Sequence, residues 1–143
     1  MNFVVVAMLL ALVLPVPAPR DDKRPKLSLK ANPSMAFTPA RIVVTGEVIG
    51  GANDDQDFYC ASPQWEWGDG TKSEQSEDCE PYQAGKSEIK RHFISDHTYY
   101  KVQDDPRVED ARDYRIQLRL KRGNKVVASA STTVRIRSGI GDQ

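Results

Sequence analysis

The chain has 143 residues, a length that suits one domain with a single hydrophobic core. Its composition, 39% hydrophobic and 28% charged, is that of a soluble globular domain and excludes a largely disordered chain. The formal net charge is zero, so the overall charge does not steer the protein towards nucleic acid or a membrane surface.

The N-terminal residues 1–18 contain no charged side chain. Their apolar run, residues 3–16, is about 14 residues long; this is shorter than the roughly 20 residues that span a bilayer and is typical of the core of a secretory signal peptide. We therefore predict a cleaved signal peptide over residues 1–18 and a secreted or periplasmic protein with no stable membrane span. No Lys or Arg precedes the run, and Pro19 directly follows the expected cleavage site. An uncleaved membrane anchor and a cytosolic tail therefore remain as alternatives.

The next segments predict a linker and two strands. Residues 19–25 begin and end with proline and are charged in between, as in a linker. Residues 26–31 alternate between polar and apolar side chains and are expected to form the first strand. Residues 41–49 are rich in β-branched side chains and are expected to form the second, with Gly46 leaving room for a bulky neighbour such as an indole. A polar loop over residues 50–57 follows.

A central strand is expected over residues 58–67, because Trp65 and Trp67 are two residues apart and so point to the same face of a strand. The turn Gly68-Asp69-Gly70 ends this strand, since glycine readily takes positive φ and an aspartate accepts hydrogen bonds from amides of its own turn. Two indoles on one face need a second layer to cover them, which predicts a sandwich or barrel core.

The second half of the chain begins with a polar, acidic insertion over residues 71–87, and residues 88–93 are expected to form a short strand. Residues 114–121 alternate regularly, with apolar side chains turned to the core and polar ones turned outwards. Arg122-Gly123-Asn124 predicts a hairpin turn, after which residues 125–137 return as the last strand. No stretch has a helical period, so we expect an all-β protein.

Three sequence blocks resemble one known family in content and order. They are Trp65-Glu66-Trp67-Gly68-Asp69-Gly70, His97-Thr98-Tyr99 and the alternating strand that begins at Tyr114. Together they resemble the PKD domain, the immunoglobulin-like module named after polycystin, over residues 27–136. The connections at residues 71–87 and 101–112 depart from the family's pattern.

The resemblance implies an immunoglobulin-like antiparallel β-sandwich of about seven strands. We place it over residues 26–138, with a C-terminal tail at residues 139–143. It also implies that the domain has no catalytic centre. The residues that would then have structural roles are Trp65, Trp67, Gly68, Asp69, Gly70, His97, Thr98, Tyr99 and Tyr114.

The two cysteines, Cys60 and Cys79, are expected to form a disulfide in an exported chain. Closing a loop of about 20 residues would stabilise the fold by on the order of 3 kcal/mol. A zinc site is not expected, because no further ligands have the required spacing. The bridge would tie down the insertion at residues 71–87, unlike the antibody disulfide that joins strands B and F.

The charges are unevenly distributed along the chain. Residues 47–80 hold ten acids and one base, whereas residues 112–137 hold eight bases and one acid. Five of these bases would share an exposed sheet face: Arg115, Arg119, Lys121, Arg135 and Arg137. Glu66 on a neighbouring strand would relieve part of their repulsion. Two interpretations stay open: a solvated face that discourages aggregation, and a binding face for an extracellular protein or an acidic polysaccharide. Nucleic acid is not expected, because no aromatic residues alternate with the bases.

The remaining polar residues suggest no catalysis. Asp69 is expected to cap its turn, and His97 to make a fixed hydrogen bond. No serine lies in a nucleophile motif. The aspartates Asp54, Asp55 and Asp57 resemble a calcium loop but lack the glycine and glutamate of an EF-hand, so a weak calcium hypothesis stands beside a solvated loop.

From these observations we expect a monomeric, non-catalytic interaction module with no cofactor, acting outside the cell or in the periplasm. A purely structural spacer or envelope domain is the main alternative. A calcium-stabilised adhesion domain and a small enzyme are weaker ones.

Overall fold

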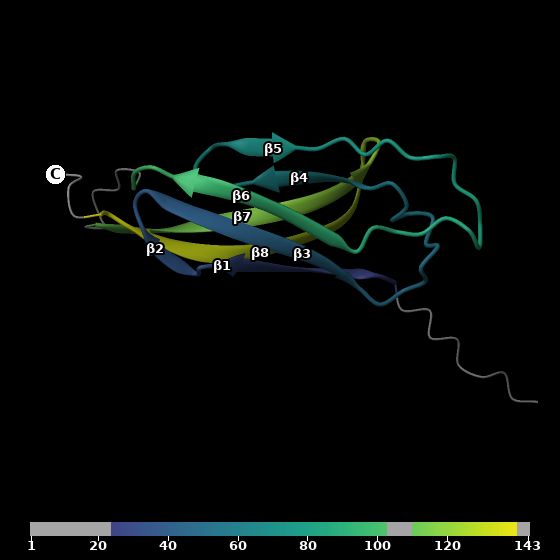
Figure 1. The fold of residues 1–143 in the computed structure, drawn as a ribbon, viewed down its shortest axis with the longest axis horizontal. Coiled ribbons are helices and arrows are strands. Elements are labelled where there is room, and N and C mark those ends of the chain that lie inside the picture. Colours follow the sequence, from purple (N-terminus) through teal and green to yellow (C-terminus); the bar gives the residue numbers. More distant parts are fainter. Residues whose placement is uncertain (1–23, 103–109, 140–143) are drawn as a thin grey trace, which may run out of the picture.

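The computed structural model describes residues 24–102 and 110–139. The predicted signal peptide, most of the linker and residues 140–143 lie outside this range. All regular secondary structure in the described residues is β (Figure 1). The strands are β1 Lys26–Asn32, β2 Met35–Phe37, β3 Ala40–Ile49, β4 Ser62–Glu66, β5 Lys72–Glu74, β6 His92–Tyr99, β7 Ala111–Arg122 and β8 Lys125–Arg137.

These strands form two sheets. One has three strands in the order β1-β3-β6, and the other has five in the order β2-β8-β7-β4-β5. All neighbours pair antiparallel except β2 and β8, which are parallel. In Figure 1 the three-stranded sheet overlies the five-stranded one, and the strands of both run along the long axis of the molecule.

One hydrophobic core lies between the sheets, because alternating residues of both turn their side chains inwards. Ile42 and Val44 of β3 are fully buried, as are Trp65 of β4 and Leu118 of β7. A Cβ atom added at Gly46 would overlap the side chain of Leu118. This glycine therefore does leave room for a bulky neighbour, although that neighbour is a leucine and not an indole.

Several predicted boundaries were wrong. The central strand covers only Ser62–Glu66, because Asp55 Oδ1 accepts hydrogen bonds from the amides of Asp57 and Phe58 and holds the preceding residues in a turn. The strand predicted at residues 88–93 instead runs over His92–Tyr99 and contains the His-Thr-Tyr block.

The sequence patterns also missed two short edge strands. β5 lies inside the acidic insertion, and β2 follows β1 after the two residues Pro33 and Ser34. Each has three residues, too few for an alternating pattern to stand out.

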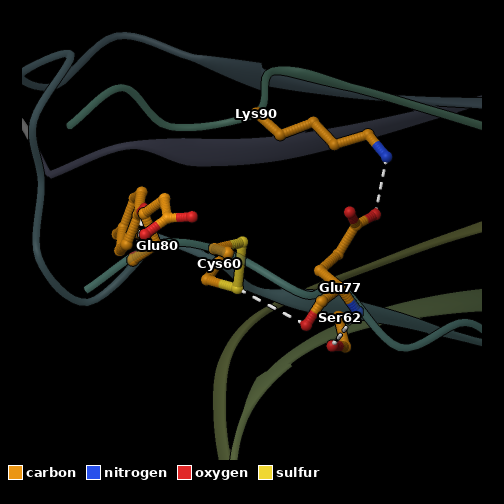
Figure 2. The surroundings of a disulfide bond; sticks show 7 residues. Cys60, Ser62, Glu77, Glu80 and Lys90 are labelled. Carbon is orange, nitrogen blue, oxygen red and sulfur yellow. Dashed lines mark hydrogen bonds and ion pairs between the residues drawn. A yellow bond between two sulfur atoms is a disulfide. The ribbon is translucent and has the colours of Figure 1, made fainter. Parts of the chain in front are cut away.

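The predicted disulfide is present, with the Cα atoms of Cys60 and Cys79 6.0 Å apart. It ties the acidic insertion to the start of β4 (Figure 2). Beside it, the amide of Glu77 donates to Ser62 Oγ (3.1 Å), and Lys90 Nζ donates to the Glu77 carboxylate (2.6 Å). The insertion is therefore anchored to the domain at several points.

Two tyrosines add to this anchoring. The ring centroids of Tyr59 and Tyr82 are 5.5 Å apart. The Tyr59 hydroxyl donates to the backbone oxygen of Glu80, and the Tyr82 hydroxyl donates to that of Asp54, both at 2.7 Å.

Candidate binding surface

The outer face is the surface of the five-stranded sheet that is turned away from the core. It carries all five predicted basic residues: Arg115, Arg119, Lys121, Arg135 and Arg137. On β7 the outward residues alternate with buried ones such as Ile116 and Leu118, so strand geometry alone sets their direction. The structure therefore brings together the residues that the sequence predicted to share a face.

Two of the five bases are paired with carboxylates on the same face. Arg119 Nη1 lies 2.7 Å from Glu66 Oε1, and Lys72 Nζ lies 3.3 Å from the same oxygen. Hydrogen bonding from Lys72, together with the charges of both cations, lowers the pKa of Glu66. Arg135 binds Asp113 through two nitrogens, at 2.7 and 3.0 Å, and this contact lowers the pKa of Asp113.

The other three bases have no carboxylate partner among the described residues. Arg115 donates to Ser131 Oγ at 3.1 Å. The guanidinium carbon of Arg137 lies 5.8 Å from the centre of the Phe37 ring, a cation–π contact. Lys121 makes no ion pair within the described part of the chain. The outer face thus retains unneutralised positive charge at three positions.

An exposed apolar pair borders these bases. Met35 and Phe37 of β2 are 52% and 58% exposed, and the parallel register places them opposite Arg135 and Arg137 of β8. Sequence reasoning missed this pair because it predicted no strand between the one that ends at residue 31 and the one that begins at residue 41. The available signal was the short run of apolar residues Met35-Ala36-Phe37.

Two shallow hollows lie on the outer face. The first, of about 330 Å³, lies between the turn after β4 and β7, and its charged lining residues are Glu66, Lys72 and Arg115. The second, of about 220 Å³, lies at the other end of β4 beside Glu74 and Lys121. Sequence reasoning did not predict either hollow, since both depend on which strands are neighbours.

The blocks that resemble the PKD domain meet in space. His97 Nε2 lies 2.7 Å from Asp69 Oδ2, and the His97 ring stacks on Trp67 at 4.9 Å. The Tyr99 hydroxyl donates to the backbone oxygen of Trp67 at 2.6 Å, and burial raises the pKa of that hydroxyl. The contacts join β6 of one sheet to the end of β4 in the other, as structural residues would.

Asp69 also closes its own turn. Its Oδ1 accepts from the amide of Thr71 at 3.0 Å and from the Thr71 hydroxyl at 2.5 Å. Partial burial by itself would raise the pKa of Asp69, but the hydrogen bonds from Thr71 and His97 outweigh it, so the net shift is downwards. The ionised form is therefore the one that the fold favours.

The three aspartates of the calcium hypothesis have separate partners. Asp54 Oδ2 accepts from the amide of Gly85 (2.8 Å), Asp55 caps its turn, and Asp57 faces Lys125 (3.5 Å). Within residues 24–102 and 110–139, no three His, Cys, Asp or Glu residues gather as a metal-ligand set. The calcium hypothesis stays a prediction.

The described segments contain no helix long and apolar enough to cross a membrane.

No protein-family model matches this sequence, and no curated protein matches it. Among solved structures, the chain is similar to the CARDB domain of the PF1109 protein from Pyrococcus furiosus, which was crystallised in complex with di-metal ions. The two are 13% identical, with a TM-score of 0.43, and the match covers 79% of this chain and 87% of that one. A score this low leaves the family open, so the resemblance to PKD domains stays a prediction.

Proposed function

We propose that this protein is an exported, non-catalytic interaction module that contacts an acidic partner through its outer face. The observation that carries this proposal is the set of three bases without a carboxylate partner in the described chain: Arg115, Lys121 and Arg137. Arginine presents several donors in a fixed fork, which suits carboxylate and sulfate groups of a partner.

The strand order supports an immunoglobulin-like sandwich of the PKD type as the scaffold. In that fold, strands A, B and E share one sheet and strands C, F and G share the other. Here β1, β3 and β6 would correspond to A, B and E, and β4, β7 and β8 to C, F and G. The disulfide supports export, because such bonds persist mainly outside the reducing cytosol.

A retention experiment tests the proposal. The oxidised protein would be immobilised and exposed to acidic proteins and acidic polysaccharides across a salt series. The test variant carries Arg115→Glu and Arg137→Glu. The matched control carries Lys26→Glu and Lys30→Glu, two exposed positions on β1 in the other sheet. We expect salt-sensitive retention by the wild type and the control but not by the test variant.

A structural spacer is the second candidate, and the paired bases favour it. Arg119 with Glu66 and Arg135 with Asp113 neutralise part of the outer face internally. A protein that retains no acidic partner at any salt concentration would contradict the binding proposal and favour this one.

A further inference from the structure

The two hollows of the outer face repeat the same combination of side chains along one strand. The first has the bases Lys72 and Arg115, the carboxylate of Glu66, the hydroxyl of Thr71 and the amide of Gln117. The second has one base, one carboxylate, amides and hydroxyls: Lys121, Glu74, Gln64, Gln75, Ser62 and Ser76. Each hollow thus offers at least one cation beside one carboxylate and several neutral donors and acceptors.

The first hollow is open to solvent, and hydrogen bonds hold two of its lining side chains in place. Glu66 is held by Arg119 and Lys72, and Gln117 Nε2 donates to Ser129 Oγ at 2.9 Å. Position 68 in its rim accepts only glycine, because the Cβ atom of any larger residue would come 2.7 Å from the backbone oxygen of Arg115. Arg115 donates a hydrogen bond from one nitrogen to Ser131 and has no carboxylate partner among the described residues.

A row of hydrogen-bonded side chains separates the hollows. Arg119 bridges Glu66 and Gln117, at 2.7 and 3.1 Å, and Gln64 donates to Glu74 across the β4–β5 pair. Arg115 and Lys121 lie six residues apart on β7, or ~20 Å along an extended strand. A ligand that reaches both cations must therefore be an elongated chain.

We propose that the outer face binds an acidic polysaccharide that lies along β7, with one sugar carboxylate beside the free cation of each hollow, Arg115 and Lys121. This inference rests on the proposed function of the outer face and names its ligand class. Two similar sites along one strand fit a polymer that repeats one anionic unit. The neutral amides and hydroxyls beside each cation fit the hydroxyl groups of a sugar ring.

A protein ligand fits these hollows less well. Protein interfaces draw most of their affinity from a few anchors, chiefly tryptophan, tyrosine and arginine side chains, in well-packed pockets from which water is excluded. Neither hollow has an aromatic lining, and Pro63, whose side chain is buried, is the one apolar residue besides glycine that borders them. The exposed pair Met35 and Phe37 lies on β2, separated from β7 by β8.

Calorimetric titrations of the oxidised protein with polygalacturonate would test the inference. The test variants are Arg115→Gln and Lys121→Gln, each of which removes the cation of one hollow. The matched control is Lys30→Gln, which removes the same charge from an exposed position on β1 in the other sheet. We expect each test variant to weaken binding about tenfold or more, since each loses a charge-assisted hydrogen bond, and the control to change it little.

Further probes separate the alternatives. Galacturonate oligomers should bind more tightly with length until they cover both hollows, and neutral dextran should not bind. Equal weakening by all three variants would overturn this inference, because binding would then follow the overall charge of the protein and not the two hollows. Tighter binding of polyglutamate, with the same dependence on Arg115 and Lys121, would overturn the polysaccharide in favour of an acidic protein. No binding of polygalacturonate would overturn this inference, whereas the retention experiment would still decide the proposed function.

Discussion

His97 and Asp69 lie 2.7 Å apart and join the two sheets at one end of the molecule. Asp69 belongs to the turn after β4, and His97 belongs to β6 of the opposite sheet. Only 19% of the His97 side chain and 16% of the Asp69 side chain are exposed, so the contact is shielded from most of the solvent. Its consequence for stability can be measured.

Asp69→Ala should destabilise the fold by about 1–3 kcal/mol, because it leaves the partly buried His97 ring and the amide of Thr71 without their partner. Urea unfolding monitored by tryptophan fluorescence would measure this loss. Asp96→Ala, which removes an exposed partner of Arg41, is the control and should cost clearly less. Equal losses in the two variants would contradict a special role for Asp69.

The contribution of Asp69 should depend on pH in a defined direction. Its pKa is lowered in the folded state, so the ionised carboxylate stabilises the fold at neutral pH. This contribution should decline as the pH falls below the unfolded value of about 3.9 and vanish below the folded pKa. The difference in unfolding free energy between wild type and Asp69→Asn should therefore shrink between pH 6 and strongly acidic pH. A difference that stays constant over this range would refute the assignment.

Trp65→Ala should cost about 3–5 kcal/mol, because it empties a fully buried position between the sheets. Phe37→Ala is the matched control: it also truncates an aromatic side chain, but one that is 58% exposed, and it should change stability by about 0.5 kcal/mol or less. Denaturant melts of both variants would compare them. A small cost at Trp65 would be incompatible with this core.

Replacing Cys60 and Cys79 together with serine should lower the unfolding free energy by on the order of 3 kcal/mol, because the unfolded chain regains the freedom of a loop of about 20 residues. Wild-type protein melted with and without reductant would provide the parallel measurement. Reductant should destabilise the wild type and leave the double variant unchanged. An effect of reductant on the variant would point to a cause other than this bond.

The β class, the core of the long strands and the disulfide were all predictable from the chain. Period-two alternation at residues 114–121 and the paired indoles at Trp65 and Trp67 are local patterns, and burial simply follows their parity. The two cysteines allowed only one intrachain pair. The basic residues of the outer face were predictable for the same reason of parity.

The local sequence pattern could not predict which of these bases pair with a carboxylate. Arg119 meets Glu66 and Arg135 meets Asp113, whereas Arg115 faces Ser131, and these neighbours follow from the register between strands that lie up to 53 residues apart. The three-residue strand β2 and the two hollows arise in the same way. Local sequence sets the direction in which a side chain points, but only the pairing of distant strands sets what it faces. The charge and shape of the proposed binding surface are for that reason properties of the folded chain.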